Sequence, residues 1–93
     1  MSKELPSSLQ LRIITPKKLL VDEVVKVVFL PSLEGTIGIL PGHRPLFTAL
    51  GKGLLSFRLD QKEQNYRIRG GFAEVFPEKV LVFTELSDDD ADE

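Results

Sequence analysis

The sequence has 93 residues, a formal net charge of −2, one histidine and no cysteine. A chain of this length forms one domain with a modest core, and the lack of cysteine excludes disulfides and cysteine-based zinc sites. The sequence holds no run of about 18 apolar residues and no secretory signal pattern, so we expect no membrane insertion and a reducing compartment.

Acidic residues are concentrated at the end of the chain. The last six positions hold five of the fourteen acidic residues, which leaves nine against twelve basic residues, or +3, for residues 1–87. Proteins that bind nucleic acids concentrate their basic residues and add aromatic platforms. The basic residues here are scattered, so we predict no nucleic-acid partner.

The first third of the chain alternates apolar and polar residues after a short polar start. Residues 1–8 are predicted to be a flexible leader. The alternation from Leu9 to Ile13 then indicates a half-buried strand. Two further apolar runs predict a short strand over Leu19–Val21 and a central strand over Val24–Leu30, with a turn at Asp22–Glu23 between them.

The segment Glu34–Leu46 carries the strongest backbone signals. Gly35 and Gly38 allow the chain to turn or to be approached closely. Leu40–His43, with Pro41 and Gly42 at its centre, predicts a type II turn, because proline presets φ and glycine accepts a positive φ.

The second half of the chain reads as strands separated by turns. Leu46–Leu50 is a short strand or a packed loop, ended by Gly51–Lys52–Gly53. A hairpin follows in which Tyr66 and Ile68 point inward, and Gly70–Gly71 predicts a tight corner or a bulge. The last two strands, 72–76 and 79–84, are joined by a turn at Pro77–Glu78.

No segment shows helical periodicity, so helix content should be close to nil. The pattern predicts an all-β fold, a flattened antiparallel β-sandwich or barrel of about ten short strands over residues 9–86. Residues 87–93 are predicted to be a disordered acidic tail. Five phenylalanines are expected in the core and Phe47 is expected to be partly exposed; the five are Phe29, Phe57, Phe72, Phe76 and Phe83.

Catalytic and metal-binding residue sets are missing from the sequence. His43 is the only histidine and the serines lack a nucleophile-elbow context, so we predict no catalytic residue, no metal site and no cofactor. A hydrolase with two carboxylates, such as Glu34 and Glu74, is arithmetically available but unsupported. His43 has two open interpretations: a turn residue that covers Pro45 or bonds a nearby carbonyl, or a contact residue on a binding loop.

The segment Glu34–Leu46, Thr48–Leu50 after it and Gly70–Val75 further on resemble the epsilon-subunit family of F-type ATP synthases. The opening Leu11–Pro16 is also similar, and the resemblance covers about residues 9–86. It implies a β-sandwich that is not an enzyme, at the foot of a rotating stalk. There it would bind the gamma subunit and the c-ring and would couple proton or sodium flow to ATP synthesis.

The resemblance also implies site residues. The c-ring-facing loop would include Glu34, Thr36, Gly42, His43 and Arg44. Thr36 stands where many relatives have an acidic residue, so Glu34 is the better candidate for a charged contact. The candidates for contact with gamma are Leu46, Phe47, Phe72 and Phe76. Without the family's C-terminal helices and basic ATP-binding motif, such a chain should couple rotation without restraining ATP hydrolysis.

The resemblance also implies a location for the chain. We expect a peripheral protein at the cytoplasmic face of a bacterial membrane, with the stromal face of a thylakoid as the other location. The sequence leaves open weak self-association of the isolated chain through its unoccupied gamma-binding face. The alternative function is a stand-alone β-sandwich module that binds a protein or a carbohydrate.

Overall fold

The computed structural model describes residues 6–87, and these residues form seven strands and no helix. Most of the predicted leader and the acidic residues 88–93 of the predicted tail lie outside the described part. The strands are β1 (Leu9–Ile14), β2 (Leu19–Val25), β3 (Val27–Ser32), β4 (Gly35–Ile39), β5 (Leu46–Leu59), β6 (Lys62–Phe76) and β7 (Lys79–Leu86).

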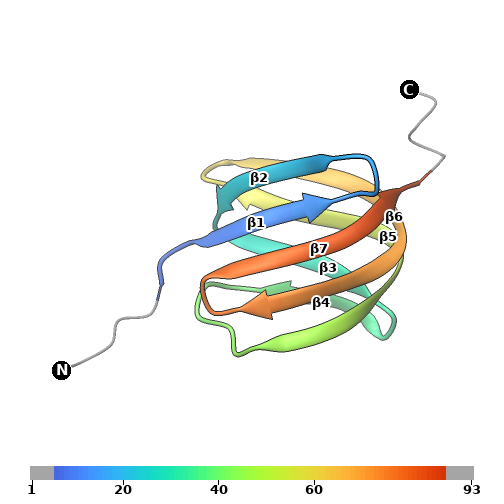
Figure 1. Cartoon of the computed structure of the whole chain (residues 1–93). Helices are drawn as coiled ribbons and strands as arrows, with labels where there is room; N and C mark the ends of the chain where they lie inside the picture. Colours follow the sequence, from blue (N-terminus) through green and yellow to red (C-terminus); the bar gives the residue numbers. More distant parts are fainter. Residues whose placement is uncertain (1–5, 88–93) are drawn as a thin grey trace.

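All seven strands belong to one sheet in the order β2-β1-β7-β6-β5-β3-β4. Neighbouring strands are antiparallel except β1 and β7, which run parallel. The sheet folds over on itself: β1, β2 and β7 lie in one layer, β3 and β4 lie in the other, and the curved β5 and β6 connect the layers (Figure 1). The Lys26 N–H donates to the Arg58 carbonyl at 2.8 Å, which joins the β2–β3 bend to β5. The predicted flattened β-sandwich is confirmed.

The strands are fewer and longer than the sequence predicted. We expected about ten short strands, whereas β5 and β6 have 14 and 15 residues. The expected break at Gly51–Lys52–Gly53 is wrong, because this segment continues β5. The side chains of Leu33 and Pro31 lie 3.4 and 3.1 Å from where a Cβ would stand on Gly51 and Gly53. These two glycines therefore make room for close packing and do not end the strand.

The boundary between β2 and β3 was also placed wrongly. Asp22 and Glu23 lie inside β2, and the bend falls at Lys26. Asp22 is held on the outer face, where its carboxylate accepts hydrogen bonds from Gln10 and from Arg12. Charged residues in an edge strand can thus face solvent without ending it.

The predicted bulge at Gly70–Gly71 is confirmed. The register between β6 and β7 shifts between Ile68 and Gly71, and both glycines have positive φ. The Thr84 hydroxyl donates to the Gly70 carbonyl. Ile68 before the bulge and Ala73 after it are both fully buried, so the extra residue keeps apolar side chains pointing inward on both halves of β6.

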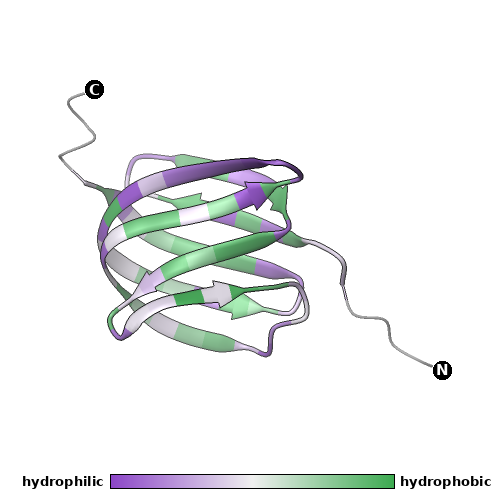
Figure 2. Cartoon of the chain, turned by 180° about the vertical axis from the view of Figure 1, so that it is seen from behind, coloured by the Kyte–Doolittle hydropathy of each residue, from purple (hydrophilic) through white to green (hydrophobic). Residues whose placement is uncertain are grey.

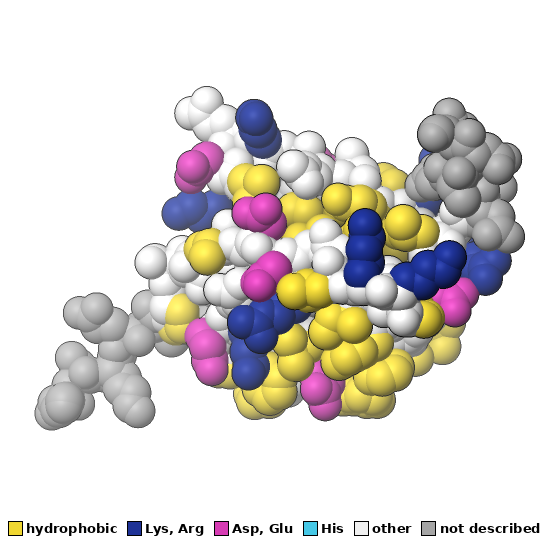
Figure 3. Space-filling model, turned by 45° about the horizontal axis from the view of Figure 1, so that its top comes forward, with side chains coloured by type: hydrophobic (Ala, Val, Ile, Leu, Met, Phe, Trp, Pro, Cys, Tyr) yellow, Lys and Arg dark blue, Asp and Glu magenta, His cyan; other side chains and the backbone are white. Residues whose placement is uncertain are grey.

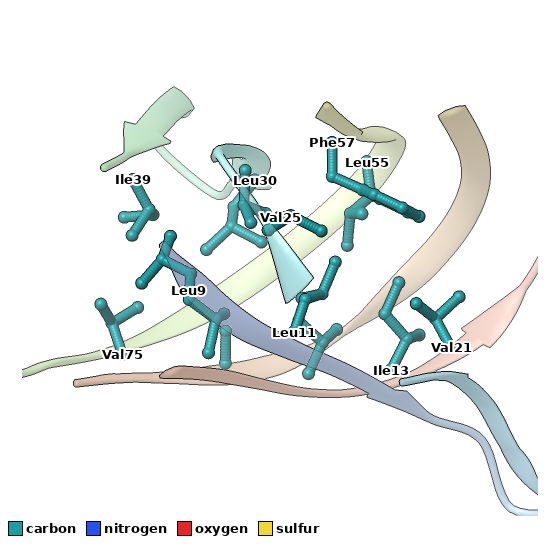
Figure 4. Packing of buried hydrophobic residues seen from close by; sticks show 14 of the residues in the cluster. Leu9, Leu11, Ile13, Val21, Val25, Leu30, Ile39, Leu55, Phe57 and Val75 are labelled. Atoms are coloured by element: carbon teal, nitrogen blue, oxygen red, sulfur yellow. The ribbon is translucent and has the colours of Figure 1, made fainter. Parts of the chain in front are cut away.

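The core fills the space between the two layers. Leu9, Leu11 and Ile13 of β1 point toward Leu30 of β3 and Phe57 of β5 (Figure 4). Figure 2 shows hydrophobic and hydrophilic residues alternating along several strands, as expected for strands that bury one face. Tyr66 and Ile68 point inward as predicted; Ile68 is fully buried and Tyr66 packs against the core.

The phenylalanines depart from the prediction. Phe57 is fully buried, but Phe29 and Phe72 are 38% and 40% exposed, and Phe76 and Phe83 are half-buried. Phe72 and Phe76 share the outer face of β6, because Ala73 and Val75 between them point inward. Phe47 is 64% exposed, which confirms its predicted exposure.

Candidate functional site

The segment Glu34–Leu46, which we call the turn-rich segment, begins at the tip of the β3–β4 hairpin. The Ser32 hydroxyl accepts a hydrogen bond from the Glu34 N–H at 3.2 Å and donates to the Gly35 carbonyl at 2.5 Å. These two bonds fix the tip locally, as Ser side chains commonly do in turns. Glu34 and Thr36 are exposed, so both predicted contact residues are available to a partner.

The predicted type II turn at Leu40–His43 is confirmed. The His43 N–H donates to the Leu40 carbonyl at 3.1 Å, and Gly42 has a φ of 87°. The Gly42 N–H donates to the Pro77 carbonyl at 2.8 Å, which ties the turn to the connection between β6 and β7. Backbone hydrogen bonds therefore close this turn and anchor it to the sandwich.

His43 is half-buried beside this turn, and Arg44 is exposed. The Nδ1 atom of His43 lies 2.7 Å from the Arg44 carbonyl oxygen. A carbonyl can only accept, so Nδ1 carries the proton in this contact. The hydrogen bond to a nearby carbonyl, expected if His43 is a turn residue, is present. The ring is also partly accessible, as a contact residue on a binding loop would need.

A second surface is formed by aromatic side chains on the outer face of β5, β6 and β7. The rings of Phe47 and Phe72 have centroids 5.4 Å apart, and those of Phe72 and Phe83 are 5.0 Å apart. Phe72 stands opposite both Ala49 of β5 and Phe83 of β7, and Phe83 stands opposite Ile14 of β1. We call Ile14, Phe47, Ala49, Phe72 and Phe83 the aromatic face. Figure 3 shows hydrophobic side chains gathered on one side of the molecule, with Lys and Arg side chains beside them.

The four predicted gamma-contact residues are only partly brought together. Phe47 and Phe72 belong to the aromatic face, and Phe76 is on the same side of β6 with the Lys79 Nζ 5.2 Å from its ring centroid. Leu46 instead stands opposite Val75 and packs against the core, so its side chain points away from this surface. Ile14 and Phe83 were missed because apolar residues on both faces of a strand leave no alternation to mark the exposed ones.

The described residues offer little for other kinds of site. Among residues 6–87, no group of three or more His, Cys, Asp or Glu side chains is arranged to hold a metal ion. Within the same residues, no helix is long and apolar enough to span a membrane.

The β-sandwich region of this chain matches a known protein family. The family model of the ATP synthase delta/epsilon chain β-sandwich domain matches residues 8–86. The chain belongs to this family. Among its relatives, the ATP synthase epsilon chain of Lawsonia intracellularis is 46% identical over 81 residues, which cover 87% of this chain and 61% of the relative. The epsilon chain of Solibacter usitatus is 36% identical over 84 residues, with 90% and 63% covered.

A chain in a solved ATP synthase structure has a similar fold. A chain in the Euglena gracilis mitochondrial ATP synthase, solved with OSCP, F1 and the c-ring, superposes with a TM-score of 0.83 at 26% identity. That match covers 90% of this chain and 54% of the Euglena chain. This chain spans about 60% of the length of the two epsilon-chain relatives named above.

Proposed function

We propose that this chain is a coupling subunit of a rotary ATP synthase, which links the gamma subunit to the c-ring and itself catalyses no reaction. Membership in the epsilon-type sandwich family is the observation that carries the proposal. The similar Euglena chain comes from an assembly that contains F1 and the c-ring. As part of such a complex, the chain acts as a peripheral protein on the cytoplasmic side of a bacterial membrane.

The aromatic face supports the gamma-binding half of the proposal. It presents neighbouring rings on adjacent strands, and exposed aromatic clusters of this kind are enriched at protein–protein interfaces. The face lies on a sheet braced by the core behind it, so a partner would bind without ordering a loop first.

The turn-rich segment supports the c-ring half. Glu34, Thr36 and Arg44 are exposed, and His43 is half-buried behind a turn fixed by two backbone hydrogen bonds. Polar side chains on such a loop suit contact with hydrophilic loops, and the two hydrogen bonds tie the turn to the sandwich, as the transmission of torque requires. Gly42 contributes no side chain, but its positive φ allows the turn that positions His43.

A calorimetric titration of the chain against the gamma subunit from the same source tests the proposal. A chain ended at Ser87 is titrated in parallel, because it keeps every described strand and removes the acidic residues 88–93. Tight binding that does not need those residues is the expected result. Lack of binding by both chains would contradict the proposal and favour a stand-alone binding module.

A further inference from the structure

The turn between β1 and β2 carries two lysines on a backbone held by hydrogen bonds. The Thr15 Oγ1 accepts hydrogen bonds from the N–H groups of Lys17 and Lys18, each at 3.2 Å. The Thr15 N–H donates to the Lys18 carbonyl at 2.9 Å, which closes the turn. Both lysines are exposed, so this threonine-held turn presents two positive charges at the surface.

Two surface hollows meet beside this turn. One, of about 530 Å³, is lined by Ile14 and by the Phe72 and Phe83 rings of the aromatic face. The other, of about 540 Å³, is lined by Lys17 and Lys18. Both are also lined by Thr15, Pro16, Arg69 and Glu85, so they form one continuous groove with an apolar end and a basic end.

The basic end of the groove keeps an excess of positive charge. Glu85 is paired with Arg69, whose Nη2 lies 2.8 Å from a carboxylate oxygen. On the outer face of β1 and β2, Asp22 is paired with Arg12 at 3.3 Å. Among residues 6–87, no carboxylate lies within 4.0 Å of the amine of Lys17 or Lys18. The two lysines therefore remain available to an anionic group from outside.

We infer that this groove binds an acidic segment that carries a large apolar side chain, presented by the gamma subunit. The inference rests on the proposed function and adds the chemistry of the partner surface. The apolar side chain fills the hollow at Phe72 and Phe83, where burial supplies most of the affinity. Carboxylates of the same segment face Lys17 and Lys18, where they fix the orientation of the partner and speed its association.

The test compares charge reversal in the groove with charge reversal elsewhere. The double variant K17E/K18E changes the basic end, and the control K26E/K62E makes the same change of charge at the far hollow lined by Lys26 and Lys62. All four lysines are exposed, on turns or at a strand end, and thermal melting checks that both variants are folded. Each chain is titrated with the gamma subunit at two salt concentrations, about 50 mM and about 300 mM.

We expect K17E/K18E to weaken gamma binding about tenfold or more at low salt and to lose most of the salt dependence of the wild type. K26E/K62E should stay within about twofold of the wild type, because exposed charges away from an interface contribute little. If wild type binds gamma and the two variants behave alike, the groove inference is overturned and the coupling function stands. If wild type does not bind gamma, both are overturned.

Two other occupants of the groove are separate outcomes. If removing residues 88–93 strengthens gamma binding by wild type but not by K17E/K18E, the acidic end of this chain occupies the lysines. If the isolated chain forms a dimer in sedimentation that K17E/K18E abolishes, a second copy occupies the groove. Either result overturns the inference.

Discussion

The ring of Phe72 stacks on the ring of Phe83 at a centroid distance of 5.0 Å and an interplanar angle of 25°, on the outer face of two paired strands. Phe47 adds a third ring at 5.4 Å from Phe72. Stacked rings on an outer face of a sheet do not contribute to the core between its layers. Their place is explained if a partner covers them, as we propose for gamma.

Replacing Phe47 with serine should weaken binding to gamma about tenfold or more while leaving the fold intact, because aromatic anchors at interfaces carry much of the binding energy. The ring is 64% exposed, so little core packing is lost. Calorimetric titration against gamma measures the change. Phe29→Ser is the matched control, since Phe29 is 38% exposed but packs beside Gly38 on β3 and β4. Equal losses in both variants would show that the aromatic face is not the gamma-binding surface.

A second pair of variants separates core from surface aromatics. Phe57→Ala should lower the free energy of unfolding by about 3–5 kcal/mol, because it empties a fully buried site. Phe29→Ala should cost less than half as much, since that ring keeps solvent contact. Urea unfolding measures both. Similar losses would mean that Phe29 is part of the core, as the sequence pattern alone suggested.

The contrast between buried and exposed phenylalanines also shows what the sequence could not predict. Alternation located β1 and the inward Ile68, because one face of each strand is polar there. It could not separate Phe57 from Phe72, because both alternate with smaller or polar residues and only pairing decides which face is inside. The turn at Leu40–His43 was predictable because proline and glycine restrict φ locally.

The predicted number of strands was wrong for a related reason. Gly51 and Gly53 carry the same local signal as a strand break, but Pro31 and Leu33 pack where their side chains would be. The cause lies in Leu33 and Pro31, which are 18 and 22 residues before the glycines that they contact and so lie outside any local pattern. The groove beside Lys17 and Lys18 was likewise hidden, because Arg69 and Glu85 reach it only through the pairing of β6, β7 and β1.

The close approach of β7 to the bulge in β6 can be tested by adding a Cβ atom at Gly71. Gly71→Ala should destabilise the domain by about 3 kcal/mol or more, because a Cβ would collide with the Phe83 carbonyl and φ is 118°. Gly35→Ala is the matched control: φ is 126°, but nothing lies within 4 Å of the added Cβ. Its cost should be about 1–2 kcal/mol, the strain of positive φ alone. Thermal melting of both variants compares them, and equal costs would mean that the close approach to Phe83 is absent in solution.

The last prediction concerns the turn that carries His43. Gly42→Val should cost about 1–3 kcal/mol of stability, because a β-branched residue is strained at a φ of 87°. His43→Ala should change stability by less than about 0.5 kcal/mol, since within residues 6–87 the hydrogen bond of its ring is to the carbonyl of the adjacent Arg44. Chemical unfolding of the two variants distinguishes a backbone role from a side-chain role. A large loss in His43→Ala would make the histidine part of the loop's structure. A small one leaves its partly accessible ring free for contact with the c-ring.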